Sequence, residues 1–362
     1  MNKSILKHYM YILIVIFNLF FYTIVHAKDQ DVLSFTLVPP KEPVEIFGDM
    51  WLIYADGVID INAAARLEQI IENNNISKHS IVYFNSPGGS LIGGVEIGRV
   101  IRKNQISTSV GKKKENKDNI QKEAICFSAC TFAYLGGKFR YMSGNSFFGV
   151  HRFYSKINLP DAEDRAQIIS AMIVSYLQEV GISEQFFVEM TRAGPNEIAL
   201  LSVPEMERLG IINNGFEQTR WSFEVVPQLD TLYLKGERDT RYGFNKVMFF
   251  CEPASNEVVM YIMFDPQGRE QTVLEMKAIS LFIDGKAYPF DRYIIKPQII
   301  NNGWLDAVFK LNSDFKNMIS NANTIGIAFQ YSYEAPLFLG FNNMNFDGAR
   351  EMYKVIINSC IK

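Results

Sequence analysis

Apolar residues in the first half of the chain follow two spacings, one typical of strands and the other of helices. Short, mainly apolar runs typical of strands occupy residues 51–54, 80–84 and 147–150, and residues 107–110 (STSV) are a further short strand candidate. Segments with a helical repeat separate them, at residues 60–73, 91–101 and 161–179. Strands that alternate with helices of this length are typical of a parallel sheet with crossover helices. We therefore predict an α/β domain over residues 48–215.

The pattern changes near residue 216. Apolar runs become shorter and are separated by turn residues, at residues 246–250, 258–264, 278–283 and 324–331. The pair Asp284-Gly285 between two such runs predicts a hairpin, and residues 348–357 predict a closing helix. Residues 216–362 are therefore expected to form a smaller, β-rich α+β domain, whose role the pattern does not indicate.

The N-terminus has the pattern of an export signal. Lys3 and Lys7 precede an apolar run over residues 10–25, and Val25-His26-Ala27 places small residues before Lys28. The run of 16 residues is short for a membrane span of about 20 residues. We predict a signal peptide over residues 1–27, a leader over residues 28–47, and an exported protein, periplasmic or secreted. An uncleaved membrane anchor is the alternative.

Charge and length limit the classes of function that this protein can have. The 362 residues include 36 basic and 39 acidic ones, a net charge of −3, which gives no basic footprint for nucleic acid. Residues 112–123 hold five lysines and three acidic residues without apolar periodicity, which predicts a solvated loop. A length of 362 residues leaves room for two domains.

Histidine is scarce, and this narrows the candidate chemistry. The chain has four histidines, and removal of the signal peptide takes away His8 and His26. Zinc sites built from several imidazoles are thereby nearly excluded, and we expect no metal and no cofactor. His79 lies in a polar stretch that is expected to be exposed, so an imidazole base would be His151.

Four cysteines remain after cleavage, an even number that permits disulfides in an exported protein. Cys251 ends a strand-like run and Cys360 lies near the C-terminus, and we predict a bridge between them. Cys126 and Cys130 are spaced tightly enough that either a disulfide or two reduced thiols would fit.

Three short motifs in the first domain carry candidate chemistry. Residues 85–90 (NSPGGS) join a buried strand to a helix, and paired glycines there expose backbone amides that bind a phosphate or an oxyanion. Ser128, in the stretch CFSAC, directly precedes a helical segment and is either a nucleophile or a simple helix cap. His151 ends a strand in the stretch GVH.

The order of these motifs, followed by residues 201–205 (LSVPE) and 209–211 (LGI), resembles the Clp protease proteolytic subunit. In particular it resembles the exported ClpP/crotonase-like periplasmic proteins. The resemblance covers roughly residues 48–215 and implies a ClpP/crotonase-like parallel sheet with crossover helices.

The resemblance also implies roles for individual residues. Ser128 is then the nucleophile and His151 the general base. The backbone amides of Gly89 and Ala129 form the oxyanion hole. An extended peptide lies along Ser90, Leu91 and Ile92, a range of three residues that follows the paired glycines.

The third member of the triad departs from the family pattern. The family places an Asp four residues before the serine of the LSVPE motif, and Ile198 stands there in this chain. Asn196 and Glu197 are the neighbouring polar candidates to orient His151.

These residues predict an exported, ATP-independent serine peptidase that acts on peptides or proteins. The resemblance implies a homo-oligomer, and no ATPase partner is expected outside the cytoplasm. A membrane would be a partner only if the N-terminal segment stays uncleaved. The alternatives are a non-catalytic peptide- or protein-binding module on the same fold, and a Ser-Lys dyad that would not need His151.

Overall fold

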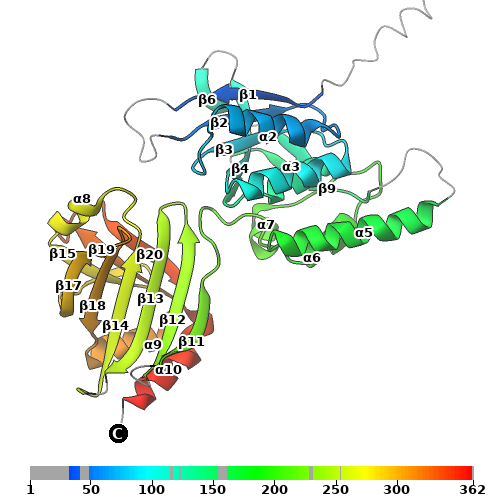
Figure 1. Ribbon diagram of the computed structural model, residues 1–362. Helices are drawn as coiled ribbons and strands as arrows, with labels where there is room; N and C mark the ends of the chain where they lie inside the picture. Colours follow the sequence, from blue (N-terminus) through cyan, green and yellow to red (C-terminus); the bar gives the residue numbers. More distant parts are fainter. Residues whose placement is uncertain are drawn as a thin grey trace, which may run out of the picture. The chain divides into compact units, whose positions relative to one another are not determined.

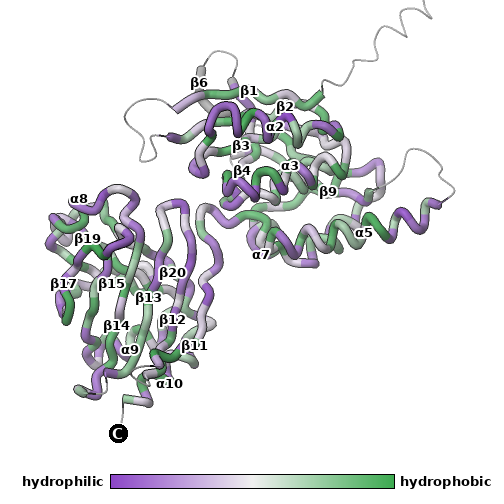
Figure 2. Tube along the Cα trace, viewed as in Figure 1, coloured by the Kyte–Doolittle hydropathy of each residue, from purple (hydrophilic) through white to green (hydrophobic). Residues whose placement is uncertain are grey.

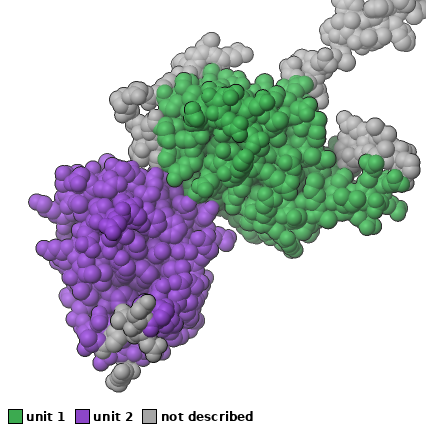
Figure 3. Space-filling model, viewed as in Figure 1, with its two compact units in different colours: residues 1–214 green, residues 215–362 purple. Residues whose placement is uncertain are grey.

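The computed structural model describes residues 32–40, 49–114, 117–121, 124–142, 144–153, 161–227, 231–252 and 254–360. The predicted signal peptide, and the leader outside residues 32–40, lie outside these ranges. The chain divides into two compact units, Met1–Asn214 and Gly215–Lys362, which Figure 3 draws in separate colours. Each unit has its own cluster of buried apolar side chains. The chain is a mixed α/β protein, as predicted.

Unit 1 contains a five-stranded sheet in the order β1-β2-β3-β4-β8 (Figure 1). Its strands are β1 (Ser34–Val38), β2 (Leu52–Asp56), β3 (Ile81–Asn85), β4 (Ser107–Val110) and β8 (Arg140–Met142). The last four run parallel, while β1 pairs antiparallel with β2. Residues 34–38, predicted as part of a leader, are therefore an edge strand of this sheet.

A second sheet of unit 1 has three strands, in the order β10-β9-β7. It consists of β7 (Ile125–Phe127), β9 (Phe147–Val150) and the short β10 (Ala199–Leu200). Ser128 directly follows β7, and His151 directly follows β9. β7 and β9 are parallel, and β10 is antiparallel to β9. The charged segment predicted as a loop contributes the hairpin β5 (Lys112–Lys114) and β6 (Lys117–Gln121).

The helices of unit 1 are α2 (Ala63–Asn73), α3 (Leu91–Lys103), α4 (Ala129–Leu135), α5 (Ala162–Glu179), α6 (Gln185–Met190) and α7 (Val203–Arg208). α3 and α4 approach each other closely at glycines. A Cβ atom on Gly94 would lie 2.2 Å from the Ala129 carbonyl oxygen, and one on Gly136 would lie 2.0 Å from the Gly98 carbonyl oxygen. Larger residues there would push α4, and Ser128 at its start, out of place.

Unit 2 has two antiparallel sheets, in the orders β11-β12-β13-β14-β18-β17 and β16-β15-β19-β20. Its strands are β11 (Arg220–Val226), β12 (Thr231–Thr240), β13 (Gly243–Glu252), β14 (Glu257–Phe264), β15 (Ala278–Ile283), β16 (Lys286–Pro289), β17 (Tyr293–Ile299), β18 (Leu305–Lys310), β19 (Thr324–Gln330) and β20 (Leu339–Asn345). The helical elements are α8 (Glu270–Glu275), α9 (Ser313–Asn321), the short 3₁₀ turn η1 (Asp347–Ala349) and α10 (Arg350–Ser359).

Local sequence explains several of these elements. Asp284 and Gly285 have φ angles of 49° and 77° and join β15 to β16, so the predicted hairpin is confirmed. Figure 2 shows hydrophilic and hydrophobic stretches alternating along α5, which buries Ile173, Tyr176 and Leu177. Among the described residues, the helices are all too short or too polar to cross a membrane.

Candidate active site

Ser128 lies between the end of β7 and the first residue of α4. Its backbone has φ 55° and ψ −124°, a conformation that is costly for a residue with a side chain. The backbone holds it there: the Ser128 amide donates to the Gly149 carbonyl at 3.0 Å, and the Ser128 carbonyl accepts from the Thr131 amide at 3.0 Å. Among the described residues, no backbone amide of α4 donates a hydrogen bond to the Ser128 hydroxyl. The Ser128 side chain therefore does not cap this helix.

A disulfide encloses this strained residue. Cys126 in β7 is joined to Cys130 in α4, with Cα atoms 5.2 Å apart, and both are fully buried. Ser128 is the middle residue of the five-residue loop that this bridge closes. Cys251 is joined to Cys360, at a Cα separation of 5.4 Å, in unit 2. Both cysteine pairs considered from the sequence are therefore at disulfide distance.

Gly88 and Gly89 lie against the start of α4. A Cβ atom on Gly88 would lie 2.7 Å from Ser128 Cβ and 3.1 Å from the Ala129 nitrogen. Gly88 and Gly89 have φ angles of 105° and 137°, which side chains rarely adopt. A larger residue at position 88 would displace Ser128.

The backbone pairing of this loop determines which way its amides point. Ile59 donates its amide to the Gly88 carbonyl at 2.8 Å, and its carbonyl accepts from the Ser90 amide at 2.7 Å. In a pair of parallel strands, a residue whose two neighbours both bond to the partner strand directs its own amide away from that strand. The Gly89 amide therefore points away from Ile59. The Ala129 amide is in the first turn of α4, where amides lack a partner within the helix.

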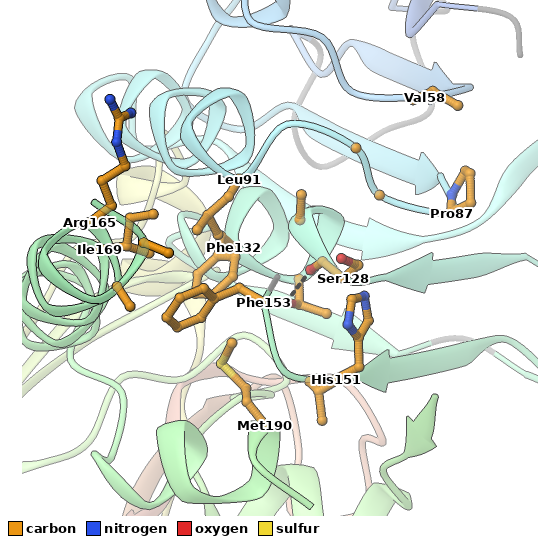
Figure 4. Close-up of a pocket in the computed structure, with 17 residues that line it drawn as sticks. Val58, Pro87, Leu91, Ser128, Phe132, His151, Phe153, Arg165, Ile169 and Met190 are labelled. Carbon is orange, nitrogen blue, oxygen red and sulfur yellow. Dashed lines mark hydrogen bonds between the residues drawn. The ribbon is translucent and has the colours of Figure 1, made fainter. Parts of the chain in front are cut away.

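His151 follows β9, and its imidazole points toward Ser128 in Figure 4. Its Nδ1 atom lies 2.7 Å from the backbone carbonyl oxygen of Arg152. A carbonyl oxygen accepts but does not donate, so in the neutral ring this contact places the proton on Nδ1. Nε2 is then the unprotonated nitrogen of the neutral ring, and a general base needs an unprotonated nitrogen.

Ser128 and His151 line one pocket of about 620 Å³ together with Gly88, Gly89 and Ala129 (Figure 4). Its other walls are largely apolar. They are supplied by several elements, and the main contributors are Leu91, Phe132, Phe153, Ile169 and Met190. Arg165 from α5 adds one guanidinium at this wall. The pocket therefore combines a polar end at Ser128 with an apolar chamber.

Of the three predicted peptide-binding residues, only one is among the described residues that line the pocket. Leu91 lines the pocket, whereas Ser90 caps α3, its hydroxyl accepting from the Gly93 amide at 3.1 Å. Ile92 is half exposed. Among the described lining residues, neither Ser90 nor Ile92 appears.

The residues considered for the third triad member lie outside the pocket lining. Asn196 and Glu197 are both exposed, and neither is among the described residues that line it. The register of β10 on β9 pairs Ala199 with Val150. Both strands end at this pair, and the same register extended by one residue places Ile198 opposite His151.

His79 is not among the described residues that line this pocket. His79 is half-buried rather than exposed as expected, and its Nδ1 lies 2.9 Å from a carboxylate oxygen of Asp49. Asp49 in turn has a pKa below its usual range, because hydrogen bonds from His79 and Ser77 outweigh the desolvation that raises it. Neither His79 nor a lysine is among the described residues that line the pocket.

Two parts of the site were not found from the sequence. The Arg152 carbonyl belongs to the backbone and leaves no signature in the residue type. Ile169 and Met190 lie on α5 and α6, far along the chain from the motifs. The apolar residues of the helix predicted at 161–179 indicated that one side of it is packed, but apolar periodicity alone does not indicate which surface that side covers.

In the described part of the chain, no group of three or more His, Cys, Asp or Glu side chains is arranged to hold a metal ion.

No family model and no curated protein matches this chain. Solved structures do. The chain is similar to a 1510-N membrane-bound stomatin-specific protease at 19% identity and TM-score 0.32, covering 44% of this chain and 75% of that one. It is similar to ClpP1 from Listeria monocytogenes at 20% identity and TM-score 0.35, covering 45% and 88%. The second of these structures is of the family that the sequence motifs resemble.

Proposed function

We propose that this protein is an exported, ATP-independent serine peptidase in which Ser128 is the nucleophile and His151 the general base. The observation that carries the proposal is their arrangement: a serine in a strained backbone conformation and a histidine with Nδ1 held by a carbonyl line the same pocket. Strained backbone at a nucleophile is found where surrounding structure holds it for function.

The reaction follows from these positions. The Ser128 Oγ attacks the scissile carbonyl carbon, and its proton passes to His151 Nε2 as the C–O bond forms. The carbonyl oxygen becomes an oxyanion, which the amides of Gly89 and Ala129 would stabilise. His151 then gives its proton to the leaving nitrogen as the C–N bond breaks.

Water completes the cycle. It attacks the acyl-Ser128 carbonyl and loses a proton to His151, which returns it to Ser128 Oγ as the ester bond breaks. The carbonyl of Arg152 takes the orienting part that a carboxylate has in other triads. Asn196 and Glu197 are kept as candidates to assist it once substrate is bound.

The two disulfides support the proposal that the protein is exported, because such bridges persist in oxidising compartments. We also propose that it acts without a cofactor and assembles as a homo-oligomer, as the sequence motifs imply. The proposed substrate is a peptide or a protein.

A set of internally quenched peptides tests the proposal. We expect hydrolysis by the wild type and a loss of at least about 10³-fold in kcat/KM for Ser128→Ala and for His151→Ala. Ser183→Ala and His79→Ala are the matched controls, and both should keep the wild-type rate. Hydrolysis that survives Ser128→Ala in purified protein would contradict the proposal.

The second candidate is a module that binds peptides without cleaving them. It is favoured by Ile198, an apolar residue opposite His151 where a carboxylate would orient the ring. This alternative predicts that the same peptides bind the wild type and stay intact over hours.

A further inference from the structure

One face of the sheet β10-β9-β7 is apolar and open to solvent. Its exposed members are Phe147 at 48%, Ile198 at 40% and Leu200 at 53% of their full surface. Large apolar side chains that stand singly on a surface need no explanation, but neighbouring ones on one sheet face indicate a binding surface.

The register shows that these residues adjoin each other. Alternation along β9 places Phe147, Gly149 and His151 on one face. Leu200 pairs with Gly149, and Ile198 stands opposite His151 on that same face. The face therefore runs along β9 and ends at His151.

Contacts at Gly149 confirm that the face is continuous. A Cβ atom on Gly149 would lie 2.4 Å from the Ile198 side chain and 2.9 Å from the Phe127 ring. The side chains of Phe127 in β7 and of Ile198, the residue before β10, therefore both lie close to this glycine. We call Phe127, Phe147, Ile198 and Leu200 the apolar face.

We infer that the apolar face binds the part of a polypeptide substrate on the C-terminal side of the scissile bond, and makes the enzyme prefer apolar residues there. The inference rests on the proposed peptidase function. A general base that protonates the leaving nitrogen must lie beside the leaving residues. His151 lies at one end of the apolar face, so the residues on the leaving side of the scissile bond would lie along this face.

The chemistry of the two sides supports this assignment. The pocket lined by Leu91 and Phe132 takes the acyl side of the substrate. The apolar face has no formal charge of its own, so a charged leaving residue would lose hydration there without a partner from the face. A segment with apolar residues on both sides of the cut is the substrate class that fits.

Pairs of quenched peptides with one acyl half and different leaving halves test the inference. One member of each pair has Leu and Phe after the scissile bond, and the other has Ser and Asp. We expect the wild type to favour the apolar member at least about tenfold in kcat/KM, a difference typical of apolar pockets. In Leu200→Ser and in Phe147→Ser this ratio should fall toward one. Ile61→Ser, at an apolar side chain that is 56% exposed elsewhere in unit 1, should keep it.

An ester with the same acyl half and no leaving residue separates the two ways of failing. If the wild type hydrolyses the ester but cleaves both peptides of a pair equally, the inference is overturned and the proposed function stands. If the ester is not hydrolysed, the proposed function fails and the inference falls with it. If Leu200→Ser changes the oligomeric state in light scattering and leaves the peptide ratio intact, a second copy of the chain covers the face and the inference is wrong.

Discussion

The Nδ1 atom of His151 lies 2.7 Å from the backbone carbonyl oxygen of Arg152, the next residue in the chain. An acceptor of this kind orients the ring and, in the neutral imidazole, leaves Nε2 unprotonated. A neutral carbonyl stabilises an imidazolium less than a carboxylate does, because it carries no full charge. If Ser128 and His151 act as proposed, we therefore expect a slower reaction than a carboxylate at this place would allow.

Introducing a carboxylate beside the ring should speed the reaction. Ile198 stands opposite His151, so Ile198→Asp places a negative charge next to the imidazole. We expect the rate of fluorophosphonate labelling to rise by about tenfold, because the charge stabilises the imidazolium that forms during attack. Val203→Asp, at an exposed position on α7, is the control for added charge alone. An unchanged rate in Ile198→Asp would show that Arg152 already supplies all the orientation needed.

The disulfide around Ser128 should matter for the reaction rate. Cys126 and Cys130 hold the ends of the loop in which Ser128 has a positive φ, a conformation that costs about 1 to 3 kcal/mol elsewhere. Without the bridge, Ser128 can relax toward an ordinary φ. We expect the double variant Cys126→Ala/Cys130→Ala to remain folded by circular dichroism and to label at least about tenfold more slowly. A folded variant with wild-type labelling would contradict this role.

The second disulfide should act on stability instead. Cys251 and Cys360 are 109 positions apart, and in the chain-entropy model a loop of that length is worth about 4 to 5 kcal/mol. Cys251→Ala/Cys360→Ala should lower the free energy of unfolding of unit 2 by about that amount, as followed in urea by the fluorescence of Trp221 and Trp304 in a Trp51→Phe background. Its labelling rate should equal that of the wild type, which makes it the matched comparison for the bridge around Ser128.

A pH-dependent contact supports the segment that holds the Gly89 loop. Both carboxylate oxygens of Asp60 accept from the Arg66 guanidinium, at 2.8 and 2.6 Å, and these bonds lower the pKa of Asp60. A carboxyl group with a depressed folded-state pKa stabilises the fold above its unfolded pKa of about 3.9, and this stabilisation is lost as the pH falls through the folded value.

Asp60→Asn should therefore destabilise unit 1 by about 0.5 to 1 kcal/mol at pH 7, the range for a largely exposed ion pair. The difference from the wild type should shrink as the pH falls below about 4. Urea unfolding at both pH values measures it, followed by Trp51 fluorescence in a Trp221→Phe/Trp304→Phe background. Glu72→Gln, on the same stretch of chain in α2, should show no such trend. A penalty that persists at low pH would mean that the Asp60 ion pair is not its cause.

Local patterns predicted much of the fold. Asp284 and Gly285 formed the hairpin because both adopt the positive φ that the turn requires. The predicted helix at residues 60–73 begins three residues later, at Ala63, since Asp60 and Asn62 are used in the turn before it. Cys251 and Cys360 pair as expected.

Long-range contacts were harder to predict. The polar segment around His79 gave no sign that Asp49, 30 residues earlier, would pair with its ring. Residues 112–114 and 117–121 lack apolar alternation, yet they pair as the strands β5 and β6, because backbone hydrogen bonds do not depend on side-chain polarity.

In the candidate site, too, local sequence predicted some parts and missed others. Ser128 and His151 were found from their motifs, and the structure brings both to one pocket. The orienting group was sought among side chains at positions 196 and 197, while the contact that the structure gives is to the Arg152 backbone. A carbonyl is present at every residue, so sequence alone cannot single one out.

The most direct measurement is mass spectrometry of the purified chain after reaction with a fluorophosphonate. The nucleophilic oxygen would form a bond to phosphorus and fluoride would leave, so the proposed peptidase predicts one adduct per chain, on Ser128. The adduct should be absent from Ser128→Ala and strongly reduced in His151→Ala. No adduct on the folded wild type, or an adduct on a different residue, would contradict the assignment of Ser128 as the nucleophile.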